Sequence, residues 1–383
     1  MTTDRTEIER RIDNARRAAA DAGADALLVC GSEYTGFEGA VFYLSGFRIL
    51  HRYAYVLVGG DDDPVAIFPG EGRWVGEHGE SWLSERAFAD VPGKWIADRC
   101  AQRGWKRLGV YGMEYAMPVR DYRALAASDA ITLVSCEETF DLARAVKSEA
   151  ELQSVRASMA INEDGFRAVL EAWEPGRSET DLMAAAEQAF FVAGTGRLTM
   201  DMVLTGKQGA ALPEMRLPDP ARALERDDML LYGLEVAGRG GHWVEFSRPI
   251  SGGSPSEETQ AMLEAYRQHR EIARTVMRAG ATSHEVHNAV SEPFRQRGWH
   301  LGHVTGHSIG MTMIEHPRIG DGIDVELRAD MICSMHPHVI SDDERTCLYM
   351  QDTWHVGPDG ARPLSEIPIA VFDGASGQPL ETA

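Results

Sequence analysis

The sequence predicts two domains, a smaller α/β domain over residues 1–142 and a larger α+β domain over residues 143–383. Its length of 383 residues exceeds what one ordinary hydrophobic core organises. Strand-like and helix-like patterns alternate in the first part, which is typical of an α/β domain. The second part contains a weak internal repeat, which predicts two copies of one α+β half with a pseudo-twofold relation.

The α/β prediction depends on a series of apolar runs. Residues 6–22 have the pattern of an amphipathic helix, and an apolar strand follows directly. Two later strands are joined by the turn GGDDDP, which is a good signal for a hairpin. The strands expected in this domain are residues 26–30, 53–58, 65–68, 108–112 and 131–136.

The internal repeat of the second domain has glycine, hydroxyl and acid residues at matching offsets. Its matching segments are GRSETDL at 176–182 with GATSHEV at 280–286, and DMLLYGLE at 228–235 with DMICSMH at 330–336. This match places Glu235 and His336 on equivalent strands, where side chains of like parity face one cleft. The sequence therefore predicts a site between the two copies.

Composition and charge restrict the kinds of partner. The net charge of −21 argues against nucleic acid and anionic membranes as partners. No apolar run approaches the roughly 20 residues of a membrane-spanning helix, and the N-terminal segment lacks the apolar core of a signal peptide. The five cysteines have no CxxC spacing, which favours reduced thiols and a cytoplasmic location.

Five segments of the second domain carry residues capable of chemistry. They are PE at 213–214, EVAGRGGHWVEFSR at 235–248, GHSIG at 306–310, SMHP at 334–337 and YMQDT at 349–353. In GHSIG, glycines frame His307, and glycine permits a close approach of the backbone. The order and framing of these segments, with EHPRIG at 315–320 and the turn GPDGARPLS at 357–365, resemble the pita-bread superfamily of creatinase, prolidase and methionine aminopeptidase.

The resemblance implies a pita-bread fold for the second domain and a creatinase-type fold for the first. It also implies a homodimer in which the N-terminal domain completes the neighbour's site. Metal-dependent members hold two divalent ions with two aspartates, one histidine and two glutamates. Carried over to this chain, these ligands fall at Glu235 (or the preceding 233–234), Glu245, His307, His336 and Gln351.

These departures reduce the negative charge of the site. Two acids remain, and Gln351 is neutral and a poor ligand, so we do not expect an oxygen-rich two-ion site. A single zinc on Glu245, His307 and His336 remains chemically possible, because two histidines and one glutamate suit a catalytic zinc. The interpretation favoured by the sequence is nevertheless a site with no metal and no cofactor.

The sequence thus favours a metal-independent, non-peptidase enzyme that acts on a small polar nitrogen-containing metabolite. C–N bond hydrolysis, or a related lyase or proton-transfer step, is the expected reaction. Creatinase, which is metal-free, and ectoine hydrolase are the relatives that it resembles in style, for example in TGK at 205–207 and EVAG at 235–238.

Acid–base catalysis is assigned to five residues. We expect Glu235 and Glu245 to be a carboxylate pair whose pKa values differ, giving one acid and one base. His307 and His336 are then a proton shuttle and a charge stabiliser, and Glu214 is a further candidate base because creatinase-like members have a histidine there.

Seven further residues are candidates for substrate binding. Arg48, His51 and Arg52 suit a substrate carboxylate, since arginine binds it with two parallel hydrogen bonds. The other candidates are His242, His316, His338 and Gln351.

Two alternatives compete with this interpretation. A metal-dependent Xaa-Pro aminopeptidase-like hydrolase predicts bound metal and inhibition by chelators. A non-catalytic pseudoenzyme of the same fold predicts that replacement of Glu235 and Glu245 by glutamine leaves its role in cells intact.

Overall fold

The computed structural model describes residues 3–33, 38–195, 202–209 and 215–380. The chain divides into two compact units. The first unit comprises Met1–Ala145 with Met311–His316, and the second comprises Val146–Gly310 with Pro317–Ala383. The division falls close to the boundary expected after residue 142, but one short segment from late in the chain belongs to the first unit.

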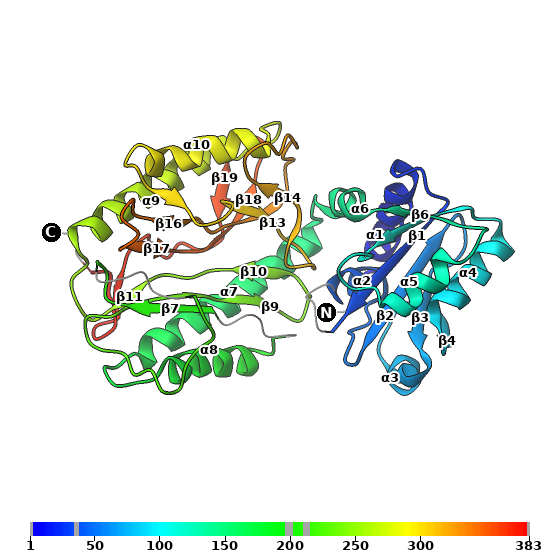
Figure 1. Cartoon of the computed structure of the whole chain (residues 1–383), viewed down its shortest axis with the longest axis horizontal. Coiled ribbons are helices and arrows are strands. Elements are labelled where there is room, and N and C mark those ends of the chain that lie inside the picture. Colours follow the sequence, from blue (N-terminus) through cyan, green and yellow to red (C-terminus); the bar gives the residue numbers. More distant parts are fainter. Residues whose placement is uncertain (1–2, 34–37, 196–201, 210–214, 381–383) are drawn as a thin grey trace. The chain divides into compact units, whose positions relative to one another are not determined.

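The first unit is an α/β domain built on one mixed sheet (Figure 1). Its strands are β1 (Ala26–Ser32), β2 (Tyr53–Gly59), β3 (Val65–Pro69), β4 (Glu85–Ala89), β5 (Arg107–Tyr111) and β6 (Thr132–Ser135). The order is β4-β3-β2-β1-β5-β6, and β2 runs antiparallel to both of its neighbours. The hairpin expected at the turn GGDDDP is therefore confirmed as β2 and β3.

Helices cover both faces of this sheet. They are α1 (Arg5–Asp21), α2 (Glu38–Ser45), α3 (Arg73–His78, after a short 3-10 turn at Gly70–Gly72), α4 (Pro92–Arg103), α5 (Val119–Ala126) and α6 (Glu137–Arg144). α1, α2 and α6 pack on the face that carries Val29 and Val56, whereas α4 and α5 pack on the face that carries Leu28 and Leu57. Successive strand residues point to opposite faces, so apolar runs without alternation produce this three-layer arrangement.

The second unit repeats one helical arrangement twice. Its helices are α7 (Glu149–Ala172), α8 (Glu179–Ala193), α9 (Glu257–Val276) and α10 (Ser283–Arg295). α7 packs on α8 as α9 packs on α10 (Figure 1). Both α8 and α10 begin with a capping box, formed by Ser178 with Asp181 and by Thr282 with Glu285. These equivalent helix starts confirm the duplication expected from the repeat.

Short strands lie between the two helix pairs (Figure 1). They are β7 (Met202–Gly206), β8 (Met229–Gly233), β9 (Glu235–Ala237), β10 (Trp243–Glu245), β11 (Ile250–Ser251), β12 (His300–Leu301), β13 (Gly306–Ser308), β14 (Glu315–Ile319), β15 (Ile332–Met335), β16 (His338–Ile340), β17 (Cys347–Tyr349), β18 (Asp352–Val356), β19 (Ala361–Pro363) and β20 (Phe372–Asp373). The sheets have the orders β10-β9, β20-β11-β8-β7, β12-β16-β17 and β14-β13-β15-β18-β19. The expected fold, a pita-bread domain after a creatinase-type domain, is confirmed.

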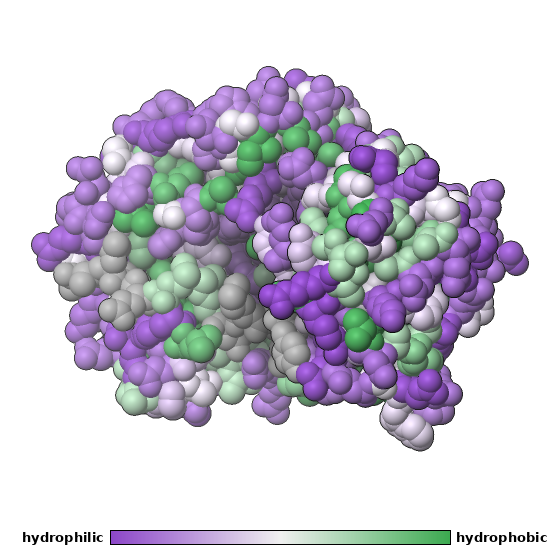
Figure 2. Space-filling view, turned by 45° about the vertical axis from the view of Figure 1, so that its right-hand side comes forward, coloured by the Kyte–Doolittle hydropathy of each residue, from purple (hydrophilic) through white to green (hydrophobic). Residues whose placement is uncertain are grey.

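The face drawn in Figure 2 is mainly hydrophilic, with hydrophobic residues in small separate patches. Within the described ranges, no helix is long and apolar enough to cross a bilayer. The five cysteines are free thiols with buried side chains. Burial raises the pKa of the Cys333 thiol to about 12, so this thiol is uncharged at neutral pH.

Candidate metal centre

Pairing between neighbouring strands brings the candidate residues together. In the β9–β10 pair, Glu235 lies directly opposite Glu245. In the larger sheet, Ser334 of β15 lies between His307 of β13 and Thr353 of β18. Side chains opposite each other project from the same face of a sheet. The register therefore gathers acids, hydroxyls and a histidine from distant parts of the sequence.

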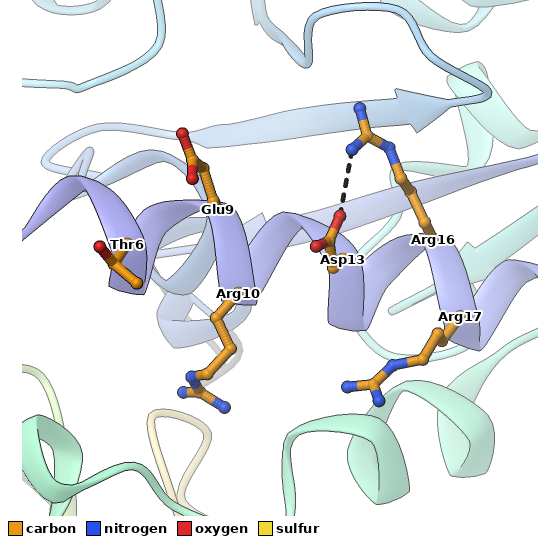
Figure 3. A pocket seen from close by; sticks show the side chains of 6 residues that line it. All are labelled: Thr6, Glu9, Arg10, Asp13, Arg16 and Arg17. Carbon is orange, nitrogen blue, oxygen red and sulfur yellow. Dashed lines mark hydrogen bonds and ion pairs between the residues drawn. The ribbon is translucent and has the colours of Figure 1, made fainter.

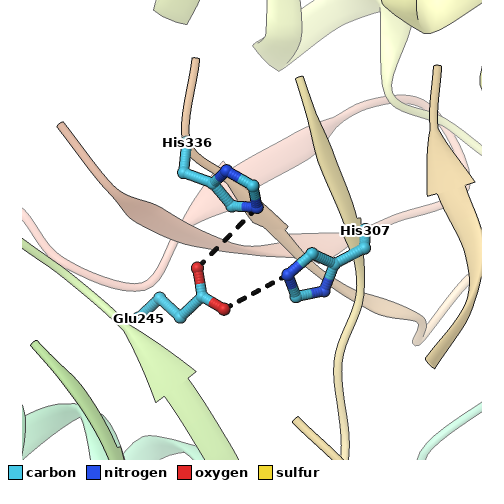
Figure 4. A group of neighbouring side chains, drawn as sticks. All are labelled: Glu245, His307 and His336. Carbon is cyan, nitrogen blue, oxygen red and sulfur yellow. Dashed lines mark ion pairs between the residues drawn. The ribbon is translucent and has the colours of Figure 1, made fainter. Parts of the chain in front are cut away.

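Glu245 is the centre of this cluster (Figure 4). Its Oε1 lies 3.2 Å from His307 Nε2, and its Oε2 lies 4.0 Å from His336 Nε2. The Ser334 hydroxyl donates a hydrogen bond to Oε2 over 2.5 Å. The backbone N–H of Glu245 donates to the Thr353 hydroxyl, and its carbonyl accepts from that hydroxyl, both over 2.9 Å. All five residues are buried, so protein donors take the place of water around the carboxylate.

The pKa values around Glu245 show which electrostatic effect dominates. Burial by itself raises the pKa of a carboxyl, but the charges of His307 and His336 and two hydrogen bonds outweigh it and hold the pKa of Glu245 at about 2. Burial also opposes a charge on His307, yet the nearby Glu245 raises the pKa of His307 above its ordinary value. For His336 burial dominates and lowers its pKa to about 4. At neutral pH His336 is therefore a neutral imidazole beside an anion.

Gln351 links the two acids of the site. Its Nε2 donates to Glu235 Oε1 over 3.2 Å and to Glu245 Oε2 over 3.3 Å. Its Oε1 accepts from the backbone N–H of Leu234 over 3.1 Å. Both Gln351 and Glu235 are buried. The structure thus places Glu235 in the same site as Glu245, with the amide of Gln351 between their carboxylates.

The donor atoms of Glu245, His307 and His336 suit one divalent ion. They lie within 4.8 Å of one another, and in the part of the chain that the structure describes no other group of three acid, histidine or cysteine side chains meets this spacing. Two imidazole nitrogens and one carboxylate are a common catalytic zinc set, which leaves a position for water or substrate. The His307 Nδ1 lies 2.9 Å from the Ser308 carbonyl, and this contact orients Nε2 towards Glu245. The residues present therefore fit a single ion.

His242 contacts α7, which belongs to the same unit. Its Nδ1 lies 2.9 Å from the Ser154 hydroxyl, and its Nε2 lies 3.8 Å from the Glu151 carboxylate. The Ser158 hydroxyl of the same helix donates to the His242 carbonyl over 2.7 Å. These contacts hold the turn between β9 and β10 against α7. The substrate-binding role expected for His242 stays a prediction.

Three of the expected substrate-binding residues belong to the first unit. The guanidinium of Arg48 lies 4.3 Å from the centre of the Phe42 ring. His51 and Arg52 are exposed, and Arg52 lies 3.3 Å from the carboxylate of Glu71. An exposed ion pair of this kind contributes little to stability. Their role in substrate binding stays a prediction.

His316 also lies in the first unit, on the short segment that joins it from late in the chain. The backbone N–H of His316 donates to Asp141 over 2.8 Å. Arg144, which is buried, anchors the same segment, because it lies 3.0 Å from Glu315 and 2.8 Å from Asp141. Glu214, the further candidate base, lies outside the described residues.

His338 lies beside the cluster of Glu245, His307 and His336. It begins β16, and its ring centre is 5.9 Å from those of His303 and Tyr349. Burial lowers the pKa of His338 to about 4, so its ring is neutral at neutral pH. The ring of His303 is 5.0 Å from that of His336. Together these rings form an aromatic wall next to His336.

Ser334 and Thr353 also belong to the site, although neither was predicted as a site residue. Each lies two positions from a residue that was selected, Ser334 before His336 and Thr353 after Gln351. In an extended segment a spacing of two places side chains on the same face. The spacing of two from a selected residue is therefore the signal that could have predicted both as site residues.

A hollow on the first unit does not have the features of a reaction site. Figure 3 shows it lined by side chains of the single helix α1, which are Thr6, Glu9, Arg10, Asp13, Arg16 and Arg17. Arg16 and Asp13 pair over 3.2 Å, one turn apart. Paired charges three residues apart are typical of a solvated helix surface.

The fold and the site together define a class of protein. Residues 153–358 match the model of metallopeptidase family M24, and residues 11–146 match that of the Creatinase/Prolidase N-terminal domain. The first match covers more than half of the 383 residues. The chain therefore belongs to metallopeptidase family M24.

Its similarity to individual proteins is modest in sequence and high in fold. It is 24% identical over 278 residues to the uncharacterized peptidase YqhT of Bacillus subtilis, covering 71% of this chain and 76% of that protein. It is 22% identical over 226 residues to an Xaa-Pro dipeptidase of Pyrococcus furiosus, covering 58% of this chain and 64% of that protein. The crystal structure of dipeptidase PepE from Mycobacterium ulcerans superposes with a TM-score of 0.80 at 22% identity, covering 97% of this chain and 99% of that one.

These findings correct the functional expectation from the sequence. A metal-independent, non-peptidase enzyme is wrong, because the family is one of metallopeptidases and the similar proteins are named as peptidases. The expectation gave too much weight to the carboxylates that this chain lacks. One ion needs less negative charge than two, and the neutral imidazole of His336 could serve as a nitrogen ligand where a carboxylate is absent.

Proposed function

We propose that this protein is a metal-dependent hydrolase that cleaves an amide bond in a short peptide, with one divalent ion held by Glu245, His307 and His336. The observation that carries the proposal is the buried cluster of these three side chains within a metallopeptidase fold. Two nitrogens and one carboxylate favour zinc over the harder magnesium or calcium, which prefer oxygen ligands.

When bound to these three residues, a divalent ion would supply Lewis acidity, which can polarise a carbonyl and lower the pKa of water. Glu245, His307 and His336 would hold the ion, because each carboxylate oxygen of Glu245 lies close to one imidazole Nε2, at 3.2 Å for His307 and 4.0 Å for His336. Glu235 is the general base: it takes a proton from the attacking water as the C–O bond forms. The same carboxyl then gives that proton to the amine nitrogen as the C–N bond breaks, so the products are an acid and an amine.

Short peptides are the proposed substrates because the similar Pyrococcus protein is named an Xaa-Pro dipeptidase and the similar structure is a dipeptidase. Arg48, His51 and Arg52 remain candidates for binding a substrate carboxylate. A homodimer, a cytoplasmic location and a place near creatinase and ectoine hydrolase stay predictions. Nucleic acid and anionic membranes are not expected as partners at a net charge of −21.

The test joins metal analysis with a panel of dipeptides that includes Xaa-Pro sequences. We expect about one zinc per chain, turnover of at least one dipeptide, and loss of turnover on treatment with a chelator that zinc reverses. Glu245→Gln is expected to lose both metal and turnover. Glu149→Gln, an exposed acid on α7 that pairs with Arg156, is the matched control and is expected to keep both.

Three outcomes decide against this proposal in different ways. Turnover that persists in metal-free protein contradicts metal dependence. Bound zinc without turnover of any peptide favours the non-catalytic alternative. Purified protein that neither contains nor takes up zinc removes the proposed centre altogether.

A further inference from the structure

We propose that Gln351 limits this centre to a single ion, because its side-chain amide fills the position between Glu235 and Glu245 that a second cation requires. The inference rests on the function proposed above. It makes Gln351 a positioning residue, which acts by holding Glu235 outside the ligand set of the ion.

The geometry of the Gln351 amide is the first argument. Its nitrogen lies 3.2 Å from Glu235 Oε1 and 3.3 Å from Glu245 Oε2. An amide NH₂ group has two hydrogens, and these two acceptors use both of them. The side chain is fully buried, so water does not compete for this position. A neutral donor therefore bridges two carboxylates that approach the same point.

The orientation of the amide is determined by its third contact. Gln351 Oε1 accepts from the backbone N–H of Leu234 over 3.1 Å. In the flipped orientation, Oε1 faces two carboxylate oxygens and the NH₂ group faces an N–H donor, so all three contacts become repulsive. The orientation with Nε2 between the acids is the one that satisfies every partner.

A cation cannot share this position with the amide nitrogen. The nitrogen of an amide has no lone pair available for a metal, and its two hydrogens carry partial positive charge. A second divalent ion would also bring the metal charge to four, against the two carboxylates Glu235 and Glu245. Glu245, His307 and His336 would hold one ion, and the Gln351 amide nitrogen already lies between the carboxylates of Glu235 and Glu245.

The same contacts determine the position of the Glu235 carboxylate. It lies opposite Glu245 in the β9–β10 register, and the Gln351 amide holds its Oε1. A carboxylate whose Oε1 accepts from the Gln351 amide is held beside the three ligand side chains without being one of them. Glu235, the proposed general base, is therefore not a ligand of the ion.

Replacement of Gln351 by glutamate tests the inference directly. In Gln351→Glu, a carboxylate oxygen replaces the NH₂ group, so three carboxylates meet where a neutral donor lay. Wild-type protein and the variant are loaded with zinc or manganese, dialysed, and measured for metal per chain. We expect one ion in the wild type and two in Gln351→Glu. Thermal unfolding with and without metal shows whether the variant is folded.

Glu235→Gln is the second variant. It tests whether Glu235 is a ligand of the ion, and it does so even if Gln351→Glu does not fold. Because Glu235 is not a ligand in this arrangement, Glu235→Gln is expected to bind one zinc with an affinity within about threefold of wild type and to lose turnover. Loss of zinc affinity by tenfold or more makes Glu235 a ligand and overturns the inference.

The ion counts separate this inference from the proposed function. One ion in both wild type and folded Gln351→Glu overturns the role of Gln351 and leaves the single-ion hydrolase standing. Two ions in the wild type overturn the role of Gln351 while metal dependence stands. No ion in the wild type overturns the proposed function, and the inference falls with it.

Discussion

The hydrogen bond from Ser334 to Glu245 gives a prediction whose magnitude follows from the structure. The Ser334 hydroxyl donates to Oε2 over 2.5 Å, and both side chains are buried. Ser334→Ala removes this bond and leaves no hydroxyl to replace it. A hydrogen bond to a charged group contributes about 1.5–3 kcal/mol. Loss of a group that orients a metal ligand costs about 10–100-fold in metal affinity, which is the same range because each tenfold equals about 1.4 kcal/mol.

Ser308→Ala is the matched control. Ser308 is a buried serine of the adjacent strand β13, and its hydroxyl donates to the Ile332 carbonyl over 3.4 Å, a long and weak contact. It does not contact Glu245 through its hydroxyl. We expect Ser308→Ala to bind zinc like the wild type and to lose less than about 1 kcal/mol of stability.

Zinc affinity is measured by competition with a chromophoric chelator, and stability by urea unfolding of the metal-free protein. The expected result is a zinc dissociation constant raised at least tenfold in Ser334→Ala alone. If the two alanine variants bind zinc with equal affinity, Glu245 is not the ligand that Ser334 orients, and the reasoning fails.

Two further predictions concern the first unit. Arg144→Ala leaves the buried carboxylates of Asp141 and Glu315 without their shared cation, and we expect it to lower the free energy of unfolding by about 3–5 kcal/mol, measured by calorimetry. The control Arg156→Ala breaks an exposed 3.0 Å pair with Glu149 and is expected to cost less than about 1 kcal/mol. Equal losses contradict the role of burial. Burial raises the pKa of Glu137 to about 7, above its ordinary 4.5, so its contribution to stability is complete below pH 4.5 and is lost as the pH rises through 7. We therefore expect the free energy of unfolding of the wild type, measured in urea, to fall by up to about 3 kcal/mol relative to that of Glu137→Gln between pH 5 and 8. A difference in unfolding free energy between the two proteins that stays constant with pH refutes this prediction.

Local patterns explain why so much of the fold was predictable. The starts of α8 and α10 were visible as repeated hydroxyl and acid residues, because a capping box needs only residues three positions apart. The hairpin of β2 and β3 was predictable from one turn. The segment Met311–His316 was not predicted to join the first unit, because its anchor on Arg144 is a contact between residues far apart in the sequence.

The candidate site was predictable in its residue types but not in its connections. Glu235, Glu245, His307, His336 and Gln351 were each selected from motifs, and the structure brings all five together. Their hydrogen bonds and ion pairs were not visible in the motifs, because a motif records spacing along the chain. The expectation of a metal-independent enzyme was wrong for the same reason, because the sequence shows which carboxylates are missing but not where the remaining donors lie.

The amino-acid sequence by itself determined the two-domain order, the duplication and the set of chemically capable residues, since all of these depend on neighbours along the chain. Only the tertiary structure decided that Ser334 and Thr353 support Glu245 and that the Gln351 amide lies between two acids. The physical reason is strand register: Glu245 and Thr353 are 108 residues apart, and their contact exists only after long-range pairing has aligned the sheets.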